Sequence, residues 1–361
     1  MWEVYLIFSL ILVLCTILPL IPNSHWVFRV ADFGKIQITL FIALTFGLGF
    51  LLKNHSYTFW ILQSILCLLL LYHAITLFKY TPFYPVEKHK RNDNSSEKFD
   101  FISANVYQFN DDYPRFINLI KQHQPDIFLT MESSGDWEKA LQILEKDYPY
   151  QHKITLENTY GMHFYTKFEV VNSTTHYFVA DDIPSVEAHL KTKDGFEFVF
   201  FGVHPPPPSP TEEETSKERD GDLLSVAKRV SEIKKPVIVV GDFNNVAWSK
   251  SSILFRKTSH LIDPRIGHGF VSTFHAKYWF LRFPIDLMFH SKEIFIKELK
   301  TLPNFGSDHL AVYCEFFLDH ENKEQESEIE KATIEEKAEA EEMIEEGKKE
   351  EGDRDAVVTE D

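Results

Sequence analysis

Cysteine is scarce in this sequence of 361 residues, which contains three, at positions 15, 67 and 314. Cys15 and Cys67 lie in long apolar runs, and Cys314 lies in a run that is expected to form a core strand. This spacing indicates no disulfide framework, which excludes the class of small disulfide-stapled domains. Because disulfide-free domains occur on both sides of a membrane, the cysteine content leaves the compartment open.

Positive charge is also in short supply, since 37 basic residues stand against 54 acidic ones and the formal net charge is −17. Residues 319–361 contain 19 acidic and 6 basic residues, so −13 of this charge belongs to them and −4 to the rest. A strongly basic surface of the kind that binds DNA non-specifically is therefore missing.

Long apolar runs, in contrast, dominate the first 80 residues. Val4–Ile21, Ile36–Leu52 and Thr58–Phe78 are each close to the roughly 20 residues needed to cross a bilayer as a helix. One such run could be a signal peptide or a buried helix, but the first lacks a positively charged start and a small-residue cleavage site. Three runs joined by short polar links predict a multi-pass anchor in the inner or plasma membrane, with membrane lipids as partners.

The charges that flank these runs give a prediction of orientation. Lys53 lies on one side of the expected membrane, and most other basic residues lie on the opposite side: Arg29, Lys35, Lys79, Lys88, Lys90 and Arg91. The positive-inside rule makes the second side cytoplasmic. The domain that follows is therefore expected in the cytoplasm.

Residues 98–318 show the pattern of a globular α/β domain, preceded by a polar linker over residues 81–97. Short β-rich runs recur at Phe99–Val106, Ile127–Met131, His163–Tyr165, Phe196–Val203, Val237–Val240, Ile285–Phe289 and Ala311–Phe317. Helical patterns lie between them at Tyr113–His123, Trp137–Lys146 and Asp220–Ser231. Alternation of this kind predicts packed sheets with helices, and 32 phenylalanines are ample for the core.

Residues 319–361 are rich in Glu, Lys and Ala and show no continuous apolar stripe. We expect a solvated tail that is partly helical or disordered, with support from pairs such as Glu345 and Lys349.

The strongest local motif is Val237-Ile-Val-Val-Gly-Asp-Phe-Asn-Asn245, a β-branched strand that leads into a glycine turn. Asp242 and Asn244 stand two residues apart at the strand end, so both side chains can point to one side. A carboxylate there can accept a proton from water or bind a metal, and an amide can donate to a phosphate oxygen. The alternative is that Asp-Phe-Asn merely forms an Asx turn.

The second motif is Gly306-Ser-Asp-His309, directly before a predicted strand. Asp308 and His309 could form a turn with a surface histidine, or a metal ligand beside a general base. A third signal is Asp286, one acid that begins an otherwise apolar strand and needs a partner if it is buried. A histidine held in one tautomer by that carboxylate would supply the partner.

Further polar residues interrupt or follow apolar strands. Asn105 and Glu132 each follow a predicted strand, and together they can offer the hard oxygen ligands that Mg²⁺ takes. His204 follows the strand Phe196–Val203 and precedes a rigid proline-rich loop. A lone histidine after an apolar strand is more often structural than catalytic, so His204 taken alone is ambiguous.

The order of these residues along the chain resembles the pattern of the endonuclease/exonuclease/phosphatase (deoxyribonuclease I-like) superfamily. The resemblance spans about residues 98–318, and its most specific parts are the Gly-Asp-Phe-Asn and Ser-Asp-His motifs. Four flanking segments are similar to a bacterial subgroup with three N-terminal membrane helices: Tyr160-Gly-Met, Ile183-Pro-Ser, His204-Pro-Pro and Arg282-Phe-Pro-Ile-Asp. The implied fold is a four-layered α/β sandwich of two packed β-sheets flanked by helices.

The resemblance implies a metal-dependent hydrolase of phosphate esters. Glu132 would be the main carboxylate for Mg²⁺, or for Mn²⁺ as a substitute, with Asn105 and Asp308 beside it. Asp242 would orient or deprotonate the attacking water, and Asn244 would stabilise the charge that develops on phosphorus.

Two histidines complete the implied site. His309, paired with Asp286, would act as a base or as a cation that binds phosphate. His204 would donate to phosphate or act as the acid for the leaving oxygen, and the acid and base roles could be exchanged. His163 departs from the family pattern, which usually has a small or apolar residue there, so it either touches the substrate phosphate or packs in the core.

Three functions remain open from the sequence. The favoured one is a hydrolase of phosphodiesters or phosphomonoesters near the membrane, acting on a lipid headgroup or a small molecule. A nuclease acting on nucleic acid ranks lower, because a basic stripe is missing. A catalytically silent membrane scaffold is the third, and the retention of all the main catalytic positions argues against it.

Overall fold

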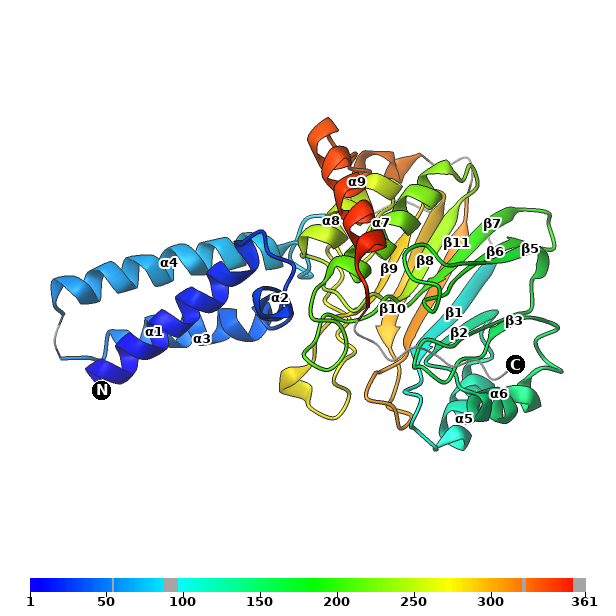
Figure 1. Ribbon diagram of the computed structural model, residues 1–361, viewed down its shortest axis with the longest axis horizontal. Coiled ribbons are helices and arrows are strands. Elements are labelled where there is room, and N and C mark those ends of the chain that lie inside the picture. The colour runs from blue at the N-terminus through cyan, green and yellow to red at the C-terminus, as the bar shows by residue number, and fades with distance from the viewer. Residues whose placement is uncertain (54, 87–96, 320–322, 353–361) are drawn as a thin grey trace.

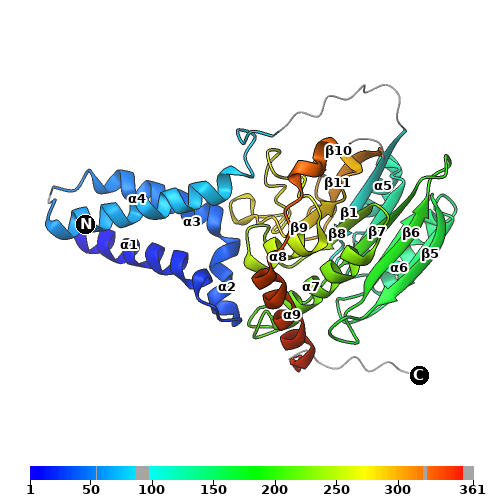
Figure 2. The same ribbon diagram turned by 90° about the horizontal axis from the view of Figure 1, so that it is seen from above.

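The computed structural model describes residues 1–53, 55–86, 97–319 and 323–352, and it has two parts (Figure 1). A bundle of N-terminal helices lies at one end of a larger unit built around two β-sheets. A second view at right angles shows the same end-to-end arrangement (Figure 2). Residues 87–96 of the predicted linker, which include Lys88, Lys90 and Arg91, lie outside the described residues, as do 320–322 and 353–361 of the tail.

The N-terminal bundle corrects the prediction of three membrane spans. It contains α1 (Trp2–Ile17), the 3-10 helix η1 (Leu18–Leu20), α2 (Trp26–Phe33), α3 (Lys35–Gly49) and α4 (Tyr57–Phe78). Within the described chain, two helices are long and apolar enough to cross a membrane, Trp2–Leu20 and Tyr57–Phe78.

The predicted middle span is wrong because its helix is too short. α3 has 15 residues, which rise about 22 Å at 1.5 Å per residue, against a hydrocarbon core of roughly 30 Å. The apolar run continues to Leu52, but the helix ends at Gly49 and the backbone turns over the next residues. The predicted span therefore included apolar residues 50–52, which lie in the turn after the helix.

Two mixed sheets form the larger unit. The first has the order β10-β11-β1-β2-β4-β3, and the second has the order β5-β6-β7-β8-β9. The strands of the first sheet are β1 (Lys98–Asn105), β2 (Ile127–Met131), β3 (Tyr150–Ile154), β4 (Met162–Thr166), β10 (Ile294–Thr301) and β11 (Val312–Leu318). Those of the second are β5 (Glu169–His176), β6 (Ser185–Lys191), β7 (Glu197–Val203), β8 (Val237–Asp242) and β9 (Asp286–His290).

Strand alternation divides the core into layers. In β1, Phe101 packs into the core between the two sheets, whereas Ile102 faces a second core under α5 (Tyr113–His123) and α6 (Gly135–Leu141). On the second sheet, Val239 belongs to a third core under α7 (Lys217–Glu232) and α8 (Lys250–Ser259). The predicted four-layered sandwich, two packed sheets flanked by helices, is confirmed.

Several elements lack a strong sequence pattern and were not predicted. β3, β5 and β10 are edge strands that expose many of their side chains, and β6 carries a buried glutamate, Glu187. Such strands lose the clean alternation of apolar residues on which strand prediction depends. Three short 3-10 helices complete the described unit: η2 (Gln142–Leu144), η3 (Trp279–Leu281) and η4 (Glu324–Glu328).

The acidic tail contains α9 (Ile334–Lys349), whose first turn is closed by a capping box between Thr333 and Glu336. The helix is not solvated all round, because Ala340 and Ile344 are buried against Leu224 of α7 and its surroundings. Gly347 allows the two helix backbones to approach, since an added Cβ would lie 2.7 Å from the carbonyl oxygen of Lys217. The contact between α9 and α7 is thus made by a few small and branched residues. These residues form no continuous apolar stripe in the sequence, so the contact was not predicted.

The topology brings the predicted site residues to one end of the sandwich. β1 runs parallel to β2, and β7 runs parallel to β8, so their carboxyl ends point the same way within each sheet. β9 and β11 are antiparallel to these strands and begin where the others end. The residues at this edge are Asn105, Glu132, His204, Asp242, Asn244, Asp286, Asp308 and His309.

Candidate active site

Asp242 occupies the last position of β8, where the chain passes close to β7. Gly241 has φ 154°, and a Cβ at this position would lie 1.9 Å from the carbonyl oxygen of Val203. Only glycine fits there. On the other side of β8, Asp242 lies directly opposite Asp286 in the register with β9.

Asn105 connects the two sheets at this edge. Its Nδ2 donates to Glu132 Oε1 at 2.8 Å and to Asp242 Oδ2 at 3.1 Å, while its Oδ1 accepts from the backbone N–H of Tyr107. One amide therefore holds two carboxylates, one from each sheet. All three side chains are buried or nearly so.

Glu132 directly follows β2 in the left-handed backbone region, with φ 61°. Its second carboxylate oxygen, Oε2, accepts from the backbone N–H of Gln108 at 3.0 Å. Burial raises the pKa of Glu132 to about 7, because the bonds from Asn105 and Gln108 only partly offset the loss of water. The pKa of Asp242 is also raised, chiefly by burial and then by the nearby charge of Asp286.

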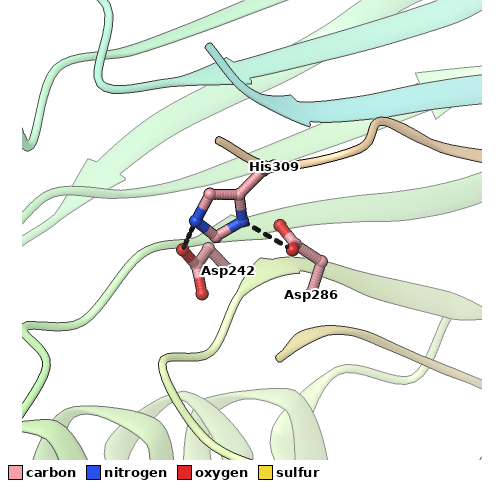
Figure 3. Close-up of side chains that lie close together, drawn as sticks. All are labelled: Asp242, Asp286 and His309. Carbon is pink, nitrogen blue, oxygen red and sulfur yellow. Dashed lines mark hydrogen bonds and ion pairs between the residues drawn. The ribbon is translucent and has the colours of Figure 1, made fainter. Parts of the chain in front are cut away.

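His309 lies between two carboxylates, as Figure 3 shows. Its Nδ1 is 2.8 Å from Asp286 Oδ2, and its Nε2 is 3.6 Å from Asp242 Oδ2. Both ring nitrogens face oxygen acceptors, which is the arrangement of a protonated imidazole. Burial alone would lower the pKa of His309, but the two carboxylates outweigh burial and raise it to about 10.

His204 lies on the other side of Asp242, with Nε2 3.8 Å from Asp242 Oδ2. Its Nδ1 is buried and has no hydrogen-bond partner among the described residues. Burial lowers the pKa of His204 to about 4, which outweighs the attraction of Asp242. The two histidines beside one carboxylate are therefore unlike, one charged and one neutral at pH 7.

Asn244 and Asp308 lie at the rim of this group. The backbone N–H of Asn244 donates to Asp242 Oδ1 at 2.9 Å, and its side-chain Nδ2 donates to the carbonyl oxygen of Pro205. Its own carbonyl oxygen accepts from Arg219 at 3.0 Å, and its backbone is left-handed, with φ 46°. Asp308 is half-buried, and its negative charge contributes to the raised pKa values of Glu132 and His309.

His163 is not brought to the site. It lies in β4, where Met162 and Phe164 face the core between the sheets and His163 faces the helical layer. Its Nε2 is 2.9 Å from Thr155 Oγ1, and burial lowers its pKa to about 4. Of the two alternatives for His163, contact with substrate phosphate or packing in the core, the geometry favours packing, because strand alternation directs this side chain into the helical layer.

Sequence reasoning missed several residues that hold the site together. Ser307 accepts from the backbone N–H of His309 and donates to the carbonyl oxygen of Asn105 at 2.8 Å, which ties the Ser-Asp-His motif to β1. Phe274 packs against the ring of His309, with centroids 4.9 Å apart. Ser307 could have been found from its place in the motif, but Phe274 and Arg219 have no sequence signal.

The residues present fit a divalent cation. Glu132 and Asp242 are two buried carboxylates that share one amide and whose pKa values are raised, so a cation beside them would relieve unfavourable negative charge. Hard oxygen donors of this kind suit Mg²⁺ or Mn²⁺.

A second set of possible ligands is defined by distance alone. Asp242, Asp286 and His309 offer ligand atoms within 4.8 Å of one another. Both nitrogens of His309 already face carboxylates, however, so this set is better described as a charged histidine held by two acids.

A comparison with protein families matches residues 102–309 to the model of the Endonuclease/Exonuclease/phosphatase family. The chain belongs to this family. Members are phosphoester hydrolases such as nucleases and phosphatases, generally dependent on divalent metal, and this chain is an enzyme of that class. A comparison with curated proteins finds no match.

Solved structures show the same fold. A family member from Bacteroides thetaiotaomicron is 22% identical with a TM-score of 0.51, covering 62% of this chain and 99% of its own. The human Nocturnin catalytic domain, solved with bound sulfate, is 19% identical with a TM-score of 0.51, covering 61% of this chain and 94% of its own. A family member from Beutenbergia cavernae is 13% identical with a TM-score of 0.50, covering 62% and 72%.

Proposed function

We propose that this protein is a membrane-anchored, Mg²⁺-dependent hydrolase of phosphate esters, with Mn²⁺ as a possible substitute. The observation that carries the proposal is the arrangement around Asp242. This buried carboxylate lies between a charged histidine, His309, and a neutral one, His204, and it shares the amide of Asn105 with Glu132.

In this proposal Asp242 accepts a proton from the attacking water. Its raised pKa makes it a stronger base than an exposed aspartate, which favours proton transfer near neutral pH. The water oxygen forms a bond to phosphorus while the bond from phosphorus to the leaving oxygen breaks.

The two histidines have different tasks in the proposal. His309, held as a cation by Asp286, binds a phosphate oxygen and offsets the negative charge that builds up on phosphorus. His204 is neutral in the resting site, and its Nδ1 has no hydrogen-bond partner among the described residues. Once His204 has taken up a second proton, it can donate a hydrogen bond to phosphate or pass that proton to the leaving oxygen, which returns it to the neutral imidazole. Asn244 then adds an uncharged donor at the rim.

Glu132 is the residue that would chiefly hold the cation, with Asn105 and Asp308 beside it. A bound Mg²⁺ would neutralise charge on the phosphate ester, which is the chemistry this ion commonly supplies in phosphoryl transfer.

Membrane anchoring is supported by the surface of the apolar helices. Only 22% of the most apolar stretch of Trp2–Leu20 and 28% of that of Tyr57–Phe78 is buried within the protein. A core helix of a soluble domain would be mostly buried, whereas most residues of these apolar stretches are not buried within the protein. We propose that they lie in a bilayer with the catalytic domain on the cytoplasmic side, as the flanking charges favour.

The favoured substrate class is a phosphate ester at or near the membrane, a lipid headgroup or a small molecule. A nuclease is the second candidate, and the near-neutral charge outside the tail disfavours it.

The test is a hydrolysis assay with Mg²⁺ on the purified full chain, against phospholipids, inositol phosphates, nucleotides and plasmid DNA. We expect turnover of at least one class by the wild type, and its loss in Asp242→Ala and His309→Ala. Asp136→Ala, which removes an exposed carboxylate of α6, is the control and should match the wild type. Equal turnover by the wild type and both site variants would overturn the proposal, and no turnover of any substrate would favour a scaffold.

A further inference from the structure

Residues Thr273–Phe283 form a hairpin, here called the aromatic hairpin, with an unusual tip. Its two ends are joined by an antiparallel bridge between Phe274 and Phe283. At the tip, the exposed fractions are 59% for Tyr278, 81% for Trp279 and 51% for Leu281. Three large apolar side chains within four residues are thus presented to the surroundings.

The tip is attached to the apolar helical bundle. Gln37 of α3 donates from Nε2 to the carbonyl oxygen of Phe280 at 2.7 Å, and the ring of Phe280 packs edge-on against Phe41 with centroids 5.9 Å apart. Phe33, at the end of α2, packs in the same way against Phe283. The exposed side chains therefore continue the apolar surface of the bundle, and Figure 1 shows this yellow segment beside the domain end of α3.

The base of the aromatic hairpin reaches the catalytic residues. Phe274 packs on the ring of His309, and the backbone N–H of Ala276 donates to the carbonyl oxygen of Asp308 at 2.6 Å. Phe274, whose side chain contacts the site, thus precedes the first tip residue, Tyr278, by four positions. The hairpin is a direct structural link between the site and the bundle.

From this link we infer that the tip of the aromatic hairpin inserts into the headgroup region of a lipid bilayer and faces the catalytic edge toward the membrane surface. Tryptophan and tyrosine favour this region, because each has an apolar ring and a polar group that needs water or a headgroup. Lys277 is exposed next to them, where its charge can meet anionic headgroups. The inference rests on the proposed membrane anchor and makes an ester at the bilayer surface the preferred substrate.

A fluorescence experiment on the full chain tests the inference. The chain is reconstituted in vesicles of phosphatidylcholine and phosphatidylglycerol and carries an environment-sensitive nitrobenzoxadiazole label on one cysteine. The test variants are Trp279→Cys and Leu281→Cys, each with Cys15 and Cys67 replaced by serine, while the buried Cys314 is left in place. Phosphatidylcholine with a spin label near the headgroup or near the chain end serves as the quencher.

Two matched positions bracket the measurement. The native Cys67 is exposed in the middle of α4, and it reports on the anchor when Cys15 alone is replaced. Tyr177→Cys, again with Cys15 and Cys67 replaced by serine, places the label on an exposed aromatic position, 47% accessible, next to β5, which lies away from the bundle in both views of the molecule.

We expect blue-shifted emission at positions 279 and 281 and loss of fluorescence with the headgroup quencher. Cys67 should instead be quenched best from the chain end, and position 177 should not respond. If Cys67 responds and positions 279 and 281 do not, the inference is overturned while the anchor stands. If position 177 is quenched as strongly as 279, the hairpin has no special role, and if Cys67 does not respond, the anchor itself is wrong.

Discussion

Two groups of buried carboxylates in this molecule differ in how completely they are paired. Glu187 of β6 accepts two bonds from Arg229, at 2.8 Å each, and lies within 2.8 Å of His176 and His189. These bonds outweigh its burial, and its pKa is held far below the ordinary range. At the catalytic edge, Glu132 and Asp242 share one neutral amide, and their pKa values are raised.

We interpret the fully paired group around Glu187 as structural and the group around Glu132 and Asp242 as catalytic. A buried carboxylate with a full set of charged donors stabilises its surroundings, whereas one that lacks them lowers stability and remains available to a proton, a cation or a substrate. Perturbed pKa values that gather at one edge of a sheet are typical of functional sites. The predictions below test this contrast in order of expected effect.

The largest effect is expected on catalysis. Asp242→Asn should lower kcat by about a thousandfold, because a neutral amide cannot accept the proton of water. The melting temperature should not fall, since the substitution removes a buried charge and keeps the shape of the side chain. Initial rates and thermal unfolding, measured on the same preparation, check both parts. A variant with normal turnover, or one that fails to fold, would contradict this assignment of Asp242.

The opposite result is expected at the paired group. Glu187→Gln should lower the free energy of unfolding by about 2–4 kcal/mol, since the Arg229 charge and the two histidines lose their partner in a mostly buried position. Turnover per folded molecule should stay unchanged. Denaturant unfolding of the variant measures the loss.

The control for that variant is Glu197→Gln on the neighbouring strand β7. Glu197 pairs with Lys235 at the surface, where both side chains are more than one-third exposed. No measurable change in stability is expected, because exposed ion pairs contribute little. A loss as large as that of Glu187→Gln would show that burial is not what distinguishes the two glutamates.

The two groups should also depend on pH in opposite directions. The pKa of Glu187 is depressed in the folded protein. Its contribution to the free energy of unfolding is therefore present above the ordinary pKa of glutamate, about 4.3, and is lost as the pH falls below that value. The pKa of Glu132 is raised to about 7 in the folded protein. Its contribution to the free energy of unfolding is therefore present below about pH 4.3 and is lost as the pH rises through 7.

Melting temperatures of the wild type and of the two glutamate variants, recorded across this pH range in the presence of a chelator, should therefore show opposite trends. Glu187→Gln should approach the wild type as the pH falls. Glu132→Gln should exceed the wild type above pH 7 by an amount equivalent to a few kcal/mol, and should match it near pH 4. Parallel curves for the wild type and Glu132→Gln would contradict the raised pKa.

Metal binding gives a smaller effect that separates the two possible ligand sets. Mg²⁺ or Mn²⁺ at about a hundred times its dissociation constant should stabilise the wild type by roughly 2.7 kcal/mol, read as a rise in melting temperature. Glu132→Gln should abolish the rise, and Asp286→Asn should retain it. The reverse outcome would move the metal to the group of Asp242, Asp286 and His309.

The smallest effect is expected at Arg219, which donates to the carbonyl oxygen of Asn244 and pairs with the adjacent Asp220. Arg219→Lys keeps the charge but loses the planar set of donors, so Asn244 is held less well. We expect kcat to fall by about three- to tenfold with little change in KM. Lys228→Ala, an exposed position of the same helix, should change neither value, and an equal fall there would remove the special role of Arg219.

Much of the fold was predictable because its central strands are apolar and bounded by polar residues. The pattern Val237–Val240 marks the heart of β8, and the single acid Asp286 at the start of β9 indicated a partner, which the structure supplies in His309. These features depend on local sequence and on the charge balance of a buried strand. They need no knowledge of how the sheets stack.

Features that depend on three-dimensional packing were not predictable. The side chain of His163 points away from the site because of the strand facing in β4, and the amide of Asn105 meets carboxylates from both sheets only after the sandwich has formed. The end of α3 at Gly49 is equally hidden, since the apolar composition continues past it. The tip residues Tyr278-Trp279-Phe280-Leu281 are consecutive in the sequence, but only the structure places them beside the helical bundle.

The pairing of β1 with β11 has a consequence for the order of events during synthesis. Ser307 and Asn105, which are bonded in the finished site, are 202 residues apart in the chain. At about 5–20 residues per second, the ribosome needs roughly 10–40 seconds to travel between them. The catalytic edge is therefore complete only after the last strand has been synthesised, so the chain cannot hydrolyse a substrate before its C-terminal part has left the ribosome.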